Sequence, residues 1–234
     1  LGEVSPAGLT ITITAMSGGT TAPSLTTAIA NMTEKQFDII AFPYNDATSL
    51  SAIEAELDDR WGPIRQNDGR AICAMDDTVG NLGTFGVGRN SKHVSMTGVY
   101  KCPTPSFEIA AGLAGIAAYY LQIDPARPLQ TLVVPGVLAP AAVDQFDIAE
   151  RNILLHDGIA TMKFAADGSA VIERMITMYQ LNGSGAADVA YLDIMTLATL
   201  SFLRWDFRNT MLRKYPRHKL GNDGTRYGAG QAII

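Results

Sequence analysis

Two adjacent aspartates form the most enzyme-like position of the sequence. Asp76 and Asp77 follow the apolar run Arg70–Met75, which is typical of a buried strand. Paired carboxylates can act as general acid and base or bind Mg²⁺, and ligands of open α/β sheets bind beyond the carboxyl ends of parallel strands. An aspartate in this position is also common as a helix cap. We therefore keep an α/β enzyme with a site at Asp76/Asp77 as the alternative function.

The segment after these aspartates is rich in glycine but has no phosphate-binding motif. Neither GxGxxG nor GxxxxGK[ST] is present, and the nearest lysine, Lys92, lies four residues beyond Gly88. The other glycines of the segment are Gly80, Gly83 and Gly86. We predict that the protein binds no cofactor there.

The histidines and cysteines lack the spacing of metal ligands. His93, His156 and His218 lie far apart, and none has a second ligand two to four positions away. Cys73 and Cys102 are 29 residues apart, with no CxxC and no paired histidine, which favours reduced core residues of an intracellular protein over a disulfide or a metal site. We predict no metal site and no catalytic residue of this kind.

Composition limits the classes of partner. The 234 residues are 47% hydrophobic and 18% charged, which is ordinary for a globular protein. A net charge of -5 and a pI near 5.1 argue against bulk nucleic-acid binding. The longest strongly apolar stretch, Ile109–Leu121, has 13 residues, whereas a membrane span needs about 20. No signal peptide is present and the first residue is Leu1, so we expect the sequence to be a fragment. From the net charge and the short apolar stretch we expect contact with neither nucleic acid nor membrane.

Strand-like and helix-like runs alternate along the first half of the chain. Leu9–Met16 alternates apolar residues with threonine, which predicts a half-exposed strand. Ser106–Gln122 predicts a helix with small residues on every side, which we expect deep in the fold. Buried strands are predicted at Phe37–Phe42, Arg70–Met75 and His93–Tyr100, and helices at Ser24–Met32, from a cap at Asp46 or Ser49 to Trp61, and at Val79–Val87.

The second half predicts a hairpin and two more helices. Ala141–Asn152 has the pattern of an amphipathic helix, and Gly158–Phe164 and Val171–Tyr179 read as strands joined at Asp167-Gly168. Together the runs predict an α/β fold, with a mixed, largely parallel β-sheet flanked by helices and a short β segment at the N-terminus. Residues 1–20 would end a preceding β-rich region, and residues 21–234 would form the core domain.

A long helix near the C-terminus has a basic end. Tyr191–Tyr215 has helical periodicity and Pro216 stops it. The segment from Arg204 to Arg226 contains seven basic and two acidic residues, so its net charge is +5 and that of the rest of the chain is -10. The segment is either a solvated helix end that complements its own dipole or a basic face that meets an acidic one on a partner.

Several motifs in the second half resemble those of Mu-type (myovirus) contractile phage tail sheath proteins. They are Asp124–Leu132, Pro135–Pro140, Glu150–Leu155 leading into Gly158–Thr161, Tyr191–Asp193, Lys214–Leu220, Asp223–Tyr227 and Gly230–Ala232. The resemblance covers most of Phe37–Ile234 and is dense after Asp124.

The resemblance implies a non-enzymatic structural subunit. Such subunits form stacked hexameric rings around the tail tube, with extended arms that add strands to the sheets of neighbouring subunits, and the sheath shortens to drive the tube through the host envelope. It implies a virion protein assembled in the host bacterial cytoplasm, with other sheath subunits and the tail tube protein as partners. The amino-terminal part of the family and its C-terminal arm and domain, expected after Gln231-Ala232, are missing.

The basic residues of the C-terminal helix are the candidate interface. We expect them to meet acidic surface on a neighbouring sheath subunit or on the tube. For Arg217 and Arg226 the alternative is that they brace the glycine-rich loop within their own subunit. The candidate subunit or tube contacts are Arg204, Arg208, Arg213, Lys214, Arg217 and Lys219.

Overall fold

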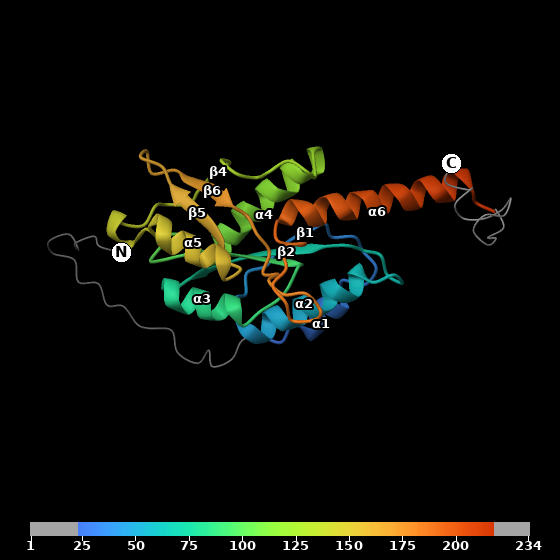
Figure 1. Ribbon diagram of the computed structural model, residues 1–234, viewed down its shortest axis with the longest axis horizontal. Helices are drawn as coiled ribbons and strands as arrows, with labels where there is room; N and C mark the ends of the chain where they lie inside the picture. Colours follow the sequence, from blue (N-terminus) through green and yellow to red (C-terminus); the bar gives the residue numbers. More distant parts are fainter. Residues whose placement is uncertain (1–22, 218–234) are drawn as a thin grey trace, which may run out of the picture.

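A computed structural model describes residues 23–217 of the chain, which form a mixed sheet covered by helices on both faces (Figure 1). The sheet order is β1-β2-β3-β5-β6-β4, parallel from β1 to β5 and antiparallel from β5 to β4. The strands are β1 Ile39–Ala41, β2 Arg70–Asp76, β3 Val94–Val99, β4 Val133–Val134, β5 Ala160–Phe164 and β6 Ala170–Arg174. This confirms the predicted fold class. The strand predicted at Leu9–Met16 lies outside the described residues.

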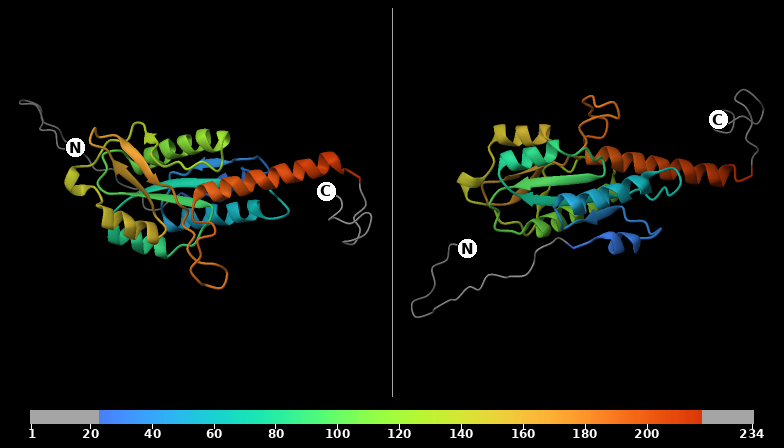
Figure 2. Two further views of the ribbon diagram at one scale, coloured as in Figure 1. Left: turned by 45° about the horizontal axis from the view of Figure 1, so that its top comes forward. Right: turned by 90° about the horizontal axis from the view of Figure 1, so that it is seen from below.

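The helices divide between the two faces of the sheet, and each face has its own core (Figures 1 and 2). Alternate residues of β2 point to opposite faces, so Ala71 and Cys73 join one core while Ile72 and Ala74 join the other. The first core contains side chains of α2 (Ala47–Trp61), α3 (Val79–Val87) and α5 (Ile148–His156), and the second contains side chains of α4 (Ser106–Ile123) and the start of α6 (Ile194–Lys214). The short α1 (Thr26–Ala30) precedes β1.

Side-chain caps fix where the helices of the first face begin. The carboxylate of Asp46 accepts a hydrogen bond from the backbone N–H of Ser49 at 2.9 Å, so Asp46 is the cap of α2 and Ser49 is not. Thr78 caps α3 in the same way. Asp147 and Glu150 form a capping box at the start of α5, which satisfies two backbone N–H groups that the helix itself cannot.

Helix α4 lies on the surface of the fold, so the prediction of a deeply buried helix is wrong. Six residues of one face are buried against the sheet, including Ile109, Leu113 and Ala117, whereas Tyr119 on the other side is 63% exposed. The small residues on every side of α4 therefore do not indicate burial on every side, because the helix contacts the sheet along one stripe only. With 18 residues, α4 is long and apolar enough by length and composition alone to cross a membrane, and in this fold it packs on the sheet.

Two predicted elements of the second half end or begin elsewhere. The start of the helix predicted over Ala141–Asn152 is wrong, because a 3₁₀ turn at Ala142–Asp144 is followed by extended backbone and α5 runs only from Ile148 to His156. Strand β6 ends at Arg174 rather than Tyr179. The chain then crosses to β3, where Met178 donates its N–H to the carbonyl of Val94 at 3.0 Å.

The hairpin predicted at Asp167-Gly168 is confirmed. Strands β5 and β6 are antiparallel neighbours, and Gly168 adopts a φ of +83°, a conformation that other residues adopt only with strain. The carboxylate of Asp167 accepts hydrogen bonds from the N–H and hydroxyl of Ser169, which closes the turn.

Candidate subunit interface on helix α6

Helix α6 is anchored to the body at its first turns. Ile194 and Ala198 are buried in the core on the α4 side of the sheet, and Leu197 between them is also fully buried. Asp193, which precedes the helix, accepts two hydrogen bonds of 3.1 Å from the guanidinium of Arg174 at the end of β6. Beyond these turns the helix projects past the edge of the body (Figures 1 and 2).

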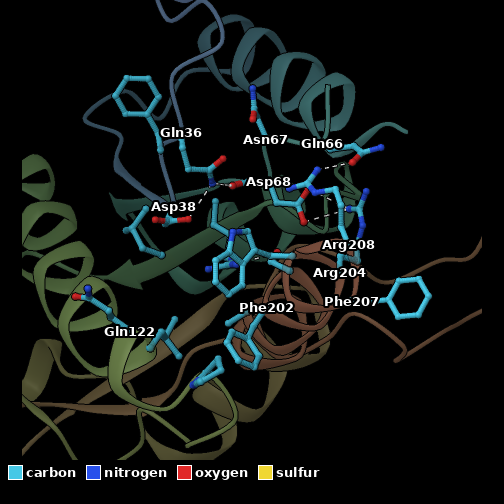
Figure 3. A pocket seen from close by; sticks show the side chains of 18 of the residues that line it. Gln36, Asp38, Gln66, Asn67, Asp68, Gln122, Phe202, Arg204, Phe207 and Arg208 are labelled. Carbon is cyan, nitrogen blue, oxygen red and sulfur yellow. Dashed lines mark hydrogen bonds and ion pairs between the residues drawn. The ribbon is translucent and has the colours of Figure 1, made fainter. Parts of the chain in front are cut away.

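Arg204, one of the predicted interface residues, contacts its own subunit. Its guanidinium lies 3.0 and 3.1 Å from the two carboxylate oxygens of Asp68 (Figure 3). It donates a hydrogen bond of 2.9 Å to the carbonyl of Trp61. It also lies 4.3 Å from the centre of the Trp61 ring, a cation–π geometry. Burial raises the pKa of Asp68, and the nearby charge of Arg204 opposes part of that rise. Arg204 therefore braces α6 against the loop before β2.

Arg208 has a similar internal role. Its guanidinium donates a hydrogen bond to the side-chain carbonyl of Gln66, in the same loop that carries Asp68 (Figure 3). Arg204 and Arg208 are one helical turn apart, so both point toward this loop. Arg204 and Arg208, the two basic residues of α6 nearest the body, thus hold the helix against the loop before β2.

The basic residues at the tip of α6 remain exposed. The side chains of Arg213 and Lys214 in the last turn and of Arg217 after it make no hydrogen bond or ion pair with another residue between 23 and 217. Their position at the C-terminal end of the helix places three positive charges at the negative pole of its dipole. Lys219 and Arg226 lie outside the described residues. The structure thus separates the predicted basic face into an internal pair, Arg204 and Arg208, and an exposed tip.

A groove of about 1440 Å³ runs along α6 from Ala198 to Leu212, between this helix, the end of α4 and the edge strand β1 (Figure 3). Its lining is largely apolar and includes Leu121, Ile123, Phe202 and Trp205, together with charged residues such as Arg70. Arg70 is 6% exposed. Its Nη2 donates to the hydroxyl of Ser201 at 3.1 Å, but its buried Nε has no hydrogen-bond partner among the described residues.

The aspartates of the alternative enzyme site have structural contacts. The two carboxylate oxygens of Asp76 accept the backbone N–H groups of Lys101 and Cys102 at 2.8 and 3.0 Å, which ties the loop after β3 to the end of β2. The carboxylate of Asp77 accepts from the N–H of Thr78 and the amide of Asn81 at the start of α3. Neither aspartate lines the large groove or the cavity of about 170 Å³ that opens near the end of β3.

His93, His156, Cys73 and Cys102 lie within the described residues, and His218 lies outside them. Among residues 23–217, no three His, Cys, Asp or Glu side chains come together as a metal site would require. Cys73 is a fully buried free thiol and Cys102 a partly buried one whose Sγ donates to the carbonyl of Leu138. Burial raises the pKa of both thiols.

Sequence reasoning missed the residues that the side chain of Arg204 contacts. Asp68 and Trp61 are 136 and 143 positions away from Arg204, and nothing in the local pattern links them. The helical pattern predicts Trp61 only as an apolar residue. Its ring contacts both the guanidinium of Arg204, at 4.3 Å, and the imidazole of His93, with ring centres 5.5 Å apart. The excess of positive charge on α6 was the one available signal.

The fold is thus an α/β body whose strand-end carboxylates accept hydrogen bonds from the adjoining loops, with one long helix projecting from it. Residues 18–178 match the family model of the phage tail sheath protein central domain, so the chain belongs to the phage tail sheath proteins. It is 42% identical over 233 residues to the Mu-like prophage FluMu tail sheath protein of Haemophilus influenzae. That match covers the whole chain but 48% of the relative, so the chain spans about half the length of the relative.

Solved structures of sheath proteins share the fold. The sheath tail protein of Desulfitobacterium hafniense superposes with a TM-score of 0.61 at 15% identity, over 82% of this chain and 43% of that one. The sheath tail protein of Listeria innocua gives the same TM-score and identity, over 87% of this chain and 45% of that one. A chain of the anti-feeding prophage baseplate gives 0.53 at 14% identity, over 77% of this chain and 47% of that one. The resemblance stated from the motifs is confirmed.

Proposed function

We propose that the chain is the core of a structural subunit of a contractile phage tail sheath, which polymerises around the tail tube and contracts to drive it through the host envelope. The observation that carries this proposal is the 42% identity with a Mu-like tail sheath protein along the whole chain. The subunit is non-enzymatic, becomes part of the virion after assembly in the host bacterial cytoplasm, and has other sheath subunits and the tube protein as partners.

The geometry of the sheet supports a structural role over the enzyme alternative. An enzyme of this fold class would present convergent polar groups in a pocket at the carboxyl ends of its strands. Here the carboxylates at that edge, Asp76 and Asp77, accept backbone and side-chain N–H groups of the adjoining loops. Their hydrogen-bonding capacity is thus directed at the fold itself.

The proposed contact with a neighbouring subunit or the tube is the basic tip of α6, which comprises Arg213, Lys214 and Arg217. These side chains are exposed and stand at the end of a helix that projects from a body of net negative charge. Opposite charges on two copies of one chain guide assembly, and exposed pairs can be exchanged at modest cost when the sheath contracts. Lys219, which follows the tip in sequence, belongs to the same proposed contact.

Charge reversal tests this contact in the full-length protein. We expect Arg213→Glu combined with Lys214→Glu to abolish sheaths in electron micrographs, because the tip would then repel acidic surface. A matched control is Arg127→Glu with Lys163→Glu, which changes the net charge equally at two other exposed positions. Normal, contractile sheaths from the tip variant would refute the proposed contact. Loss of sheaths from both variants would show that net charge, rather than the tip, is responsible.

A further inference from the structure

The direction of the strands gives the body two different ends. In a parallel sheet each covering helix begins beside the carboxyl end of the preceding strand, so α2, α3 and α4 begin at the end of the body that holds Asp76. Helix α5 begins there too, just after Asp144, whose carboxylate lies 2.8 Å from the ammonium of Lys101 in the loop after β3. The base of α6 lies at the other end, where Arg204 contacts the loop before β2. The far end of α6 and the helices α3 and α5 accordingly lie at opposite ends of the molecule (Figure 1).

Carboxylates collect at the end where the helices begin, because the positive pole of a helix dipole favours them. Asp46 and Asp147 cap α2 and α5, and Glu108 lies in the first turn of α4. Two basic residues of this end, Lys101 and Arg151, are already paired with other carboxylates. The carboxylates of this end that form no ion pair with any lysine or arginine between residues 23 and 217 are together named the acidic end: Asp46, Asp76, Asp77, Glu108, Asp147 and Glu150.

Large apolar side chains lie exposed beside these carboxylates. Phe107, Leu138 and Ile148 are each at least half exposed. Phe107 adjoins Glu108 at the start of α4, and Ile148 is the first residue of α5. Leu138 donates its N–H to a side chain of the loop between β3 and α4, which places it at the same end. Exposed apolar groups rimmed by charges are typical of a surface that another protein covers.

The basic tip of α6 is complementary to the acidic end in charge. Its residues Arg213, Lys214 and Arg217 are exposed. Their long aliphatic stems can cover apolar side chains while their charged heads pair with carboxylates. Within one subunit the tip and the acidic end lie at opposite ends and cannot meet (Figures 1 and 2). Two copies in the same orientation, placed end to end, bring these two surfaces together.

We propose that the acidic end of one sheath subunit receives the basic tip of α6 of the next subunit. This inference rests on the subunit contact proposed above, and it names the surface that the tip binds. The contact is heterologous, because each copy offers its tip at one end and accepts a tip at the other. Repetition of such a contact forms a ring or a helix, the arrangements from which a tubular sheath is built. The tail tube protein is then not the partner of the tip.

Reversal of both partners in the full-length protein tests this pairing. Glu108→Lys with Asp147→Lys makes the acidic end more basic, and Arg213→Glu with Lys214→Glu makes the tip acidic. We expect each pair of substitutions alone to reduce the amount of sedimentable sheath at least about tenfold. The fourfold variant should regain sheaths to within about threefold of the unsubstituted protein, because opposite charges face each other again. A folded fourfold variant that assembles no better than the tip variant would overturn the inference.

Chemical coupling of unsubstituted sheaths covers the case in which lysines at the helix starts prevent folding. A water-soluble carbodiimide joins a lysine amine to a carboxylate in contact with it, and is itself hydrated to a urea. Mass spectrometry then identifies the two residues. We expect Lys214 to couple to Glu108, Asp147 or another carboxylate of the acidic end in sheaths, and not in fractions that sedimentation shows to be monomeric. Lys101, which contacts Asp144 within its own subunit, should couple in both and is the control.

The outcomes separate this inference from the contact of the tip itself. Coupling of Lys214 to the tube protein, only to other carboxylates of the sheath subunit, or to none would overturn the acidic end as the receiving surface. The tip would still be a contact if its charge reversal abolished sheaths. Normal sheaths from Arg213→Glu with Lys214→Glu would refute the contact of the tip, and this inference with it.

Discussion

Arg204 on α6 and Asp68 before β2 form an ion pair of 3.0 and 3.1 Å that joins positions 136 residues apart. The side chain of Asp68 is 10% exposed and that of Arg204 is 35% exposed. The same guanidinium covers the ring of Trp61 at 4.3 Å, so three elements meet at one side chain. This arrangement sets the direction in which α6 leaves the body.

Replacing Arg204 with alanine should destabilise the fold. The change removes the partner of a largely buried carboxylate, a hydrogen bond to the Trp61 carbonyl and the ring contact. We expect a loss of about 1–3 kcal/mol in the free energy of unfolding, measured by urea titration. Arg204→Lys should recover only part of it, because an ammonium lacks the planar fork. Arg213→Ala, at the exposed tip, is the control, and an equal loss there would contradict the bracing role.

The stability of the fold should fall between pH 6.5 and about 4 because of His93. This side chain is 1% exposed, and burial lowers its pKa to about 4 despite the nearby carboxylate of Asp58. The positive charges of Lys92 and Arg70 lower the pKa further. The unfolded chain takes up a proton near pH 6.5 while the folded chain does not, so folding weakens as the pH falls through this window.

Urea unfolding at several pH values measures this effect. We expect roughly 1–3 kcal/mol of stability to be lost from pH 7 to pH 4. His93→Gln should flatten the dependence, whereas His156→Gln, at an exposed position, should leave it intact. An unchanged pH dependence in the His93 variant would show that other groups cause it.

Two glycines of α3 should respond oppositely to alanine. A Cβ at Gly86 would lie 2.0 Å from the backbone oxygen of Asp157, which follows α5, whereas a Cβ at Gly80 would meet nothing within 4 Å. We expect Gly86→Ala to cost roughly 2–4 kcal/mol, because α3 and α5 must separate. Gly80→Ala should be neutral or stabilise by up to about 1 kcal/mol through helix propensity. Thermal unfolding of both variants measures the difference, and similar melting temperatures would disprove the close approach.

Asp76 should matter for stability. Its carboxylate accepts the N–H groups of Lys101 and Cys102, and Lys101 has a φ of +45° that these contacts help to hold. We expect Asp76→Ala to cost about 1 kcal/mol in urea unfolding, and Asp76→Asn, which keeps one acceptor oxygen, to cost less. A variant as stable as the unsubstituted protein would remove the structural explanation for this aspartate.

The fold was predictable where the signals were local. The buried strand before Asp76, the cap at Asp46 and the turn at Gly168 follow from apolar runs, a carboxylate at a helix start and a conformation that glycine prefers. The capping box at Asp147 was equally local, but the apolar residues on both sides of it read as one helix. The burial of α4 could not be inferred, because small residues fit both a crowded interior and one stripe of contact.

The candidate site was predictable in its charge but not in its partners. The run of arginines and lysines from Arg204 onward marks an unusual surface on sequence alone. Which of them turn inward depends on the loop that holds Gln66 and Asp68, which lies between α2 and β2 and far from α6 in the sequence. Long-range pairing of this kind is decided by tertiary structure.

The projection of α6 has a mechanical consequence. From Arg204 to Lys214 the helix rises about 15 Å beyond its ion pair with Asp68, so this part acts as a lever with the ion pair as its pivot. A swing of about 10° at that pivot displaces the far end by about 3 Å, while the sheet itself need not deform.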